Sequence, residues 1–214
     1  MKGKKIFYIA LFFSLIVILY GCNGRNSRGY LEDRIGTQIS RVYPTKNLED
    51  LFEQFPNGFT IYQSYQLSDK FIDIVLDGVE KGKPIEGTIK VINRDSGAEE
   101  KKIAVTYDKG KYSYDNEEEA RKLWPIEKFL FQEMTLNKEI LSKFKLKDTY
   151  YNGNNGSFEI EYVVKNEQIN EFLELENKQK VTLGFHGSNS NKRYYYSLTV
   201  EIDKKLDFIE RIEE

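Results

Sequence analysis

GTIKVINRDSGAEEKKIAVTY, residues 87–107, is the stretch of sequence that decides the fold. Two runs of alternating apolar and polar side chains, at 87–93 and 101–107, flank the turn-forming sequence RDSG at 94–97. A connection this short joins antiparallel neighbours, because a parallel crossover needs about a dozen residues or more. The stretch therefore predicts a β-hairpin with one buried and one wet face.

The same period of two extends on both sides of this hairpin. Upstream it runs through residues 59–67 and 72–77, and downstream DKGK at 108–111 leads into YSYD at 112–115. Four or five strands joined by such short turns predict an antiparallel meander. The last third of the chain alternates again, in the runs 158–164, 181–185 and 194–202.

Helical spacing of apolar side chains appears in four segments. The first begins at Leu31 and ends before Pro44, and its apolar positions share one face: Leu31, Ile35, Ile39 and Val42. The others are a short helix at 47–55, a helical region at 116–147 and a short helix at 166–177. Apolar stripes usually face a core, so we expect these helices to pack on one face of the sheet. The predicted fold class is α+β, built on a large antiparallel sheet.

Length and charge bound the classes of protein to which the chain can belong. Its 214 residues, 40% of them hydrophobic, suffice for one substantial core, and we expect a single, monomeric α+β domain at 31–214. The chain carries 32 basic and 34 acidic side chains. Without the lysines at positions 2, 4 and 5, 29 basic groups would face 34 acidic ones. This balance argues against nucleic-acid binding, which needs a concentrated basic surface.

The N-terminus has the layout of an export signal. MKGKK at 1–5 is basic, IFYIALFFSLIVILY at 6–20 is apolar except for Ser14, and Gly21 and Cys22 follow. The apolar run is short for a permanent span, which needs about 20 residues. Cys22 is the single cysteine of the chain, which excludes an intramolecular disulfide and a multi-cysteine zinc site. An uncleaved anchor and a leader cut at another position remain alternatives.

Leu19-Tyr20-Gly21-Cys22 resembles a bacterial lipobox, although Tyr20 is larger than the residue usual at that place. The resemblance implies that the Cys22 thiol receives a diacylglyceryl group and that the chain is cut between Gly21 and Cys22. The expected organisation is a signal peptide at 1–21, a flexible tether at 22–30 and the domain. The expected location is the outer face of the cell membrane, where two or three acyl chains anchor a protein firmly.

A second resemblance lies in the body of the chain. YPTKNLEDLF at 43–52 resembles the signature of the staphylococcal tandem-type lipoproteins, and VINRDSG at 91–97 and YNGNNGSFEIEYVV at 151–164 resemble other segments of that family. The resemblance implies a surface lipoprotein of a Gram-positive bacterium, without catalytic residues and associated with host interaction. It also implies a half-wrapped sheet similar to those of lipoprotein carriers, which would hold an apolar ligand.

Residues that carry enzymatic chemistry do not assemble into a recognisable set. His186 is the sole histidine and Cys22 is assigned to lipid, so no Ser/His/Asp or Cys/His arrangement forms. The acidic run 117–119 is interpreted as a solvated helix start, and GKPIEG at 82–87 lacks the ending of a phosphate loop. We therefore expect no enzyme, no metal site and no cofactor.

Two functions remain as hypotheses. The first is a surface protein that binds a host or envelope macromolecule through exposed aromatic side chains, since the chain has 15 tyrosines. In a strand, Tyr195 points away from Tyr194 and Tyr196, so one side of this run is expected in the core. The second hypothesis is a carrier of an apolar small molecule or lipid, held in a cavity between sheet and helices.

Overall fold

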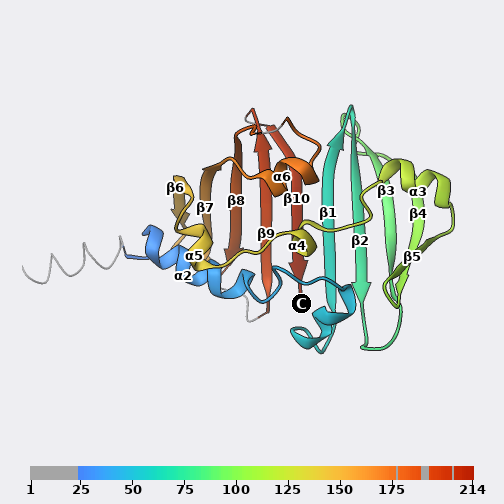
Figure 1. The fold of residues 1–214 in the computed structure, drawn as a ribbon, viewed down its shortest axis with the longest axis horizontal. Coiled ribbons are helices and arrows are strands. Elements are labelled where there is room, and N and C mark those ends of the chain that lie inside the picture. The colour runs from blue at the N-terminus through green and yellow to red at the C-terminus, as the bar shows by residue number, and fades with distance from the viewer. Residues whose placement is uncertain (1–23, 177, 189–192, 204) are drawn as a thin grey trace, which may run out of the picture.

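The computed structural model describes residues 24–176, 178–188, 193–203 and 205–214. Its centre is a ten-stranded antiparallel sheet in the order β5-β4-β3-β2-β1-β10-β9-β8-β7-β6 (Figure 1). The predicted α+β class and the large antiparallel sheet are confirmed. The predicted signal peptide, Gly21 and Cys22 lie outside the described residues.

The first five strands form the meander that the alternating sequence predicts. Each pairs antiparallel with the next along the chain. Their bounds are β1 Phe59–Leu67, β2 Lys70–Gly78, β3 Ile85–Asn93, β4 Glu99–Asp108 and β5 Lys111–Tyr114. The β3–β4 turn is fixed by Asn93, whose Oδ1 accepts hydrogen bonds from the backbone N–H groups of Asp95 and Ser96 at 3.1 and 3.0 Å.

The last five strands form a second meander. Their bounds are β6 Lys145–Tyr151, β7 Ser157–Val164, β8 Val181–Ser188, β9 Tyr195–Ile202 and β10 Lys205–Glu213. The final strand, β10, is absent from the sequence prediction, yet it pairs antiparallel with β1 and joins the two meanders. We call the β1–β10 pair the seam. Strands β5 and β6 are the two free edges of the sheet.

The helices are short and lie mainly on one face of the sheet, toward the viewer in Figure 1. They are α2 Arg28–Ile39, a 3-10 helix at Leu48–Glu53, α3 Glu117–Leu123, α4 Leu130–Glu133, α5 Lys138–Leu141 and α6 Glu167–Phe172. Helix α2 begins three residues earlier than the predicted domain boundary, because Ser27 caps it and accepts a hydrogen bond from the backbone N–H of Tyr30. Residues 28–30 therefore form the first turn of α2.

The helical region predicted at 116–147 is wrong at its end. Residues from Lys145 onward form strand β6 and pair with β7, with a register shift between Leu146 and Asp148. The four-residue helix α5 ends at Leu141, and Phe144, which continues the apolar stripe of Ile140 and Leu141, lies in the turn before β6. Apolar positions three and four residues apart therefore occur here without one continuous helix.

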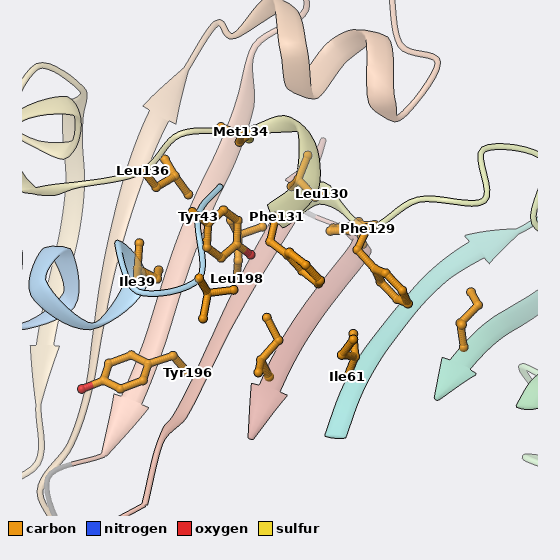
Figure 2. Packing of buried hydrophobic residues seen from close by; sticks show 14 of the residues in the cluster. Ile39, Tyr43, Ile61, Phe129, Leu130, Phe131, Met134, Leu136, Tyr196 and Leu198 are labelled. Atoms are coloured by element: carbon orange, nitrogen blue, oxygen red, sulfur yellow. The ribbon is translucent and has the colours of Figure 1, made fainter. Parts of the chain in front are cut away.

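One continuous apolar core lies between the sheet and the segments that cross it. Figure 2 shows Phe129, Leu130 and Phe131 of the chain around α4 above Ile61 of β1 and Leu198 of β9. The rings of Phe129 and Phe131 stack with centroids 5.4 Å apart. The segment around α4 therefore covers the seam and packs on both meanders.

Candidate functional site

Glu210 of β10 is a carboxylate buried in the middle of the core face, with only 1% of the residue exposed. It accepts hydrogen bonds from the backbone N–H groups of Leu130 and Phe131 at 2.6 and 3.0 Å and from the Tyr43 hydroxyl at 2.6 Å. The Gln63 amide donates a longer one of 3.4 Å. These contacts tie the seam to the start of α4 and to the chain after α2.

Burial sets the ionisation of this carboxyl. It raises the pKa of Glu210 to about 7, although the Tyr43, Leu130, Phe131 and Gln63 donors act in the opposite direction. Burial and the neighbouring carboxylate also raise the pKa of the Tyr43 hydroxyl, which therefore remains a donor. Because its oxygens already receive four donors, Glu210 is an internal tether between elements and has no free capacity for a ligand.

A pocket of about 440 Å³ lies at one end of the seam, on the face of the sheet that carries the helices. We call it the seam pocket. It is lined by Gln63, Tyr65, Gln66 and Leu67 of β1, residues 122–126 at and after the end of α3, residues 172–175 at and after the end of α6, Ile202 of β9 and Phe208 of β10. Elements of both meanders thus contribute walls to one site.

The walls of the seam pocket are mostly apolar and its aromatic wall is held firmly. Trp124 is 2% exposed, and its ring packs edge-on against Tyr112 and tilted against Phe129, with centroid distances of 5.0 and 5.2 Å. The Tyr65 hydroxyl donates to the Leu123 carbonyl and so links β1 to the end of α3. These contacts fix the position of this wall of the pocket.

A few polar groups interrupt the apolar lining. The Trp124 indole Nε1–H is buried and has no hydrogen-bond partner among the described residues. Lys122 and Glu174 also line the pocket, and the Lys122 ammonium pairs with Glu118 at 2.7 Å. Leu67 is 47% exposed. Such a site suits an apolar molecule with a small polar head.

The residues singled out in the sequence do not gather at this pocket. The half-buried His186 lies on the opposite face of the sheet, with its Nε2 3.2 Å from Thr199 Oγ1 and its Nδ1 3.5 Å from a Glu159 carboxylate oxygen. In the acidic run, Glu117 and Glu118 pair with Arg121 and Lys122 one helical turn on, and Glu119 pairs with Lys101 of β4. These pairs match the expectation of a solvated helix start.

The tyrosine run of β9 divides as expected. Tyr194 and Tyr196 are buried, at 5% and 8% exposed, whereas Tyr195 lies on the other face. There the Arg211 guanidinium lies 5.5 Å from the Tyr195 ring centroid and 5.0 Å from that of Tyr62. Both rings are therefore engaged by a side chain of the same domain.

Large apolar side chains that are exposed occur singly in the described part of the chain. They are Leu67 at the end of β1, Val79 after β2 and Tyr150 in the edge strand β6. They come from different ends of the sheet, so no exposed aromatic patch supports a macromolecular partner. That partner stays a prediction from the sequence.

Residues 24–214, apart from the short segments that the structure leaves undescribed, lack two further features. No cluster of three or more His, Cys, Asp or Glu side chains is placed to hold a metal ion. No helix there has the length and apolar character required to cross a membrane.

Sequence reasoning missed the seam pocket because it assigned the apolar residues of 116–147 to the core. The available signal was Trp124 immediately before Pro125, where a helix must end beside a large aromatic side chain. In comparisons with known proteins, the chain matches no family model and no curated protein. The likeness to tandem-type lipoproteins therefore rests on the short motifs at 43–52, 91–97 and 151–164 alone.

Proposed function

We propose that this chain is a non-enzymatic surface lipoprotein, anchored to the membrane through lipid on Cys22, whose domain binds an apolar small molecule or lipid in the seam pocket. The pocket is the single observation that carries the binding function. Its volume of about 440 Å³ lies in the range of small-molecule sites, about 300–1,000 Å³.

The chemistry of the lining defines the ligand class. The walls formed by Leu123, Trp124, Phe172 and Leu175 favour an apolar body, because transfer of apolar surface out of water stabilises the complex. The polar side chains in the lining, among them Gln66 and Lys122, favour one hydrogen-bond acceptor on that body, such as a carbonyl or carboxyl oxygen. A fatty acid or an ester lipid has both features.

We also propose that the sheet is half-wrapped, as in lipoprotein carriers. Such a sheet would hold its ligand between sheet and helices. The position of the seam pocket between β1, β10 and the ends of α3 and α6 is what supports this description.

The binding function is tested by titrating the protein with cis-parinaric acid, a fluorescent fatty acid. Trp124 is the only tryptophan of the chain, so energy transfer from it to the probe reports occupancy of the pocket directly. We expect saturable transfer in the wild type. Leu67→Glu places a carboxylate in the apolar lining and should weaken binding at least tenfold, because burying that charge is unfavourable.

The matched control is Val79→Glu. The substitution again replaces an exposed apolar side chain by glutamate, but Val79, which is 77% exposed, does not line the pocket. We expect its affinity to stay within twofold of the wild type. Binding that is lost equally in both variants, or transfer that does not saturate, would contradict a ligand site in the seam pocket.

A further inference from the structure

We propose that the β6 edge of the sheet lies against the leaflet that holds the Cys22 lipid. The inference rests on the lipid anchor of the proposed function. The surface concerned, which we call the edge surface, consists of Arg25, Lys143, Lys145 and Tyr150, all exposed. Its partner is an anionic phospholipid surface.

The first step is that the chain just after Cys22 is fastened to β6. The Arg25 guanidinium donates to the Tyr151 hydroxyl at 3.5 Å and lies 5.9 Å from the centroid of its ring. The Asn26 carbonyl accepts from Thr149 Oγ1 at 3.0 Å. The segment therefore follows the outer strand of the sheet before helix α2 starts.

The second step is that α2 is locked to the same corner of the domain. The Arg28 guanidinium donates to the carbonyl oxygens of Ser142 and Phe144 at 2.7 and 3.0 Å, and its Nε lies 2.7 Å from a carboxylate oxygen of Glu32. The ring of Tyr30 packs edge-on against Tyr151, with centroids 6.3 Å apart. Figure 1 shows the start of α2 and helix α5 beside β6 at this end of the sheet.

The third step is the length of the connection. Arg25 is the third residue after Cys22, and a fully extended chain spans at most about 3.6 Å per residue, so the two Cα atoms lie within about 11 Å. The headgroup region on each side of a bilayer is about 5–8 Å deep. A lipid on Cys22 therefore places the β6 edge within reach of the headgroups.

The fourth step is the chemistry of the edge surface. Arg25, Lys143 and Lys145 form no ion pair within the described part of the molecule, whereas Lys147 of the same strand pairs with Glu161 at 3.2 Å. Cations close to an anionic membrane are attracted to it. Tyr150 is 52% exposed, and tyrosine favours the boundary between lipid and water.

The opposite edge lacks this combination. Strand β5 offers the exposed residues Lys111 and Ser113, and Lys109 before it lies 3.8 Å from the Asp108 carboxylate. The chain of residues 115–119 that follows is acidic except for Asn116. An anionic surface should therefore attract the β6 edge and not the β5 edge.

The test is energy transfer from a single dye on the full-length lipidated protein to a headgroup-labelled phospholipid. The vesicles contain phosphatidylcholine with phosphatidylglycerol. The dye is attached to Tyr150→Cys at the β6 edge or to Ser113→Cys at the β5 edge, because the Cys22 thiol is occupied by lipid. We expect at least twofold higher transfer efficiency from position 150.

A charge-reversed protein sharpens the test. Arg25→Glu combined with Lys143→Glu and Lys145→Glu should lower transfer from position 150 toward the value at 113. The matched control reverses three exposed lysines elsewhere, in Lys83→Glu combined with Lys109→Glu and Lys111→Glu. It should leave the transfer from position 150 unchanged.

Equal transfer from positions 150 and 113 would contradict docking of the β6 edge. Transfer from position 150 that charge reversal at the edge surface does not lower would contradict it as well. Fatty-acid labelling of the same preparation separates the two proposals. Labelled protein with equal transfer contradicts the orientation alone, whereas unlabelled protein contradicts the lipid anchor and with it the orientation.

Discussion

The carboxyl of Glu210 shows how one residue can organise a core. It lies between Leu198 of β9 and Gln63 of β1 in the row of side chains that faces the helices. Among the described residues no cation pairs with it, and neutral donors from three separate segments satisfy its oxygens instead. Burial favours the neutral, protonated form of such a carboxyl, so its contribution to stability depends on its protonation state.

This arrangement predicts a pH dependence of stability. The folded state holds the Glu210 proton more tightly than the unfolded chain, because burial raises the pKa from 4.5 to about 7. The free energy of unfolding should therefore fall as pH rises through this interval, by about 3 kcal/mol from this group. Urea unfolding at pH 5 and pH 8 measures the fall. In Glu210→Gln the contribution should disappear.

The same substitution should also lower stability at pH 5 by about 1–3 kcal/mol, since one end of the amide can only donate and would face the N–H groups of α4. Glu118→Gln, which changes an exposed carboxylate, is the control and should keep the wild-type pH dependence. If the wild type and Glu210→Gln lose the same stability between the two pH values, the carboxyl does not titrate as described.

Sequence alone could not indicate this role. A glutamate at the centre of DFIERIE interrupts an apolar face formed by Phe208 and Ile212, so the alternation does not predict a strand. Its donors Tyr43 and Leu130 lie 167 and 80 residues away along the chain. Only the folded arrangement brings them together.

At the scale of elements, the contact between α2 and α5 depends on a glycine. A Cβ atom added at Gly36 would lie 2.6 Å from the backbone nitrogen of Lys138, closer than such atoms approach in proteins. The two helices can therefore approach only because this side chain is absent.

Gly36→Ala should accordingly destabilise the protein by about 1–3 kcal/mol, because α5 must move away from α2. Gly29→Ala in the same helix is the matched control, with no atom within 4 Å of the added Cβ. It should leave stability unchanged or raise it by about 0.5–1 kcal/mol through helix propensity. Chemical denaturation compares the two variants. Equal effects would show that the helix contact at Gly36 is not tight.

The elements differ in how far the sequence predicts them. Strands β1 to β5 follow from a period of two between short turns, which is a local signal. The boundary between α5 and β6 does not follow from the sequence. Ile140, Leu141 and Phe144 have helical spacing, but α5 ends at Leu141, and pairing with β7 makes the residues from Lys145 onward a strand. Local pattern was overridden there by sheet formation.

At the scale of the whole molecule, the two meanders meet at the seam, and the seam pocket exists only through that meeting. Gln63 and Trp124 come from the first part of the chain, and Phe172 and Phe208 from the second. The sequence could predict the fold class and a cavity between sheet and helices as one hypothesis. It could not predict where the pocket lies, because each wall comes from a different segment of the chain.

We propose that this domain works at a membrane, attached through Cys22. Metabolic labelling with a fatty acid, followed by mass spectrometry of the mature N-terminus, tests it most directly. We expect the wild type to be labelled and to begin at residue 22, and we expect Cys22→Ala to carry no label. Unlabelled wild-type protein that retains residues 1–21 would contradict it.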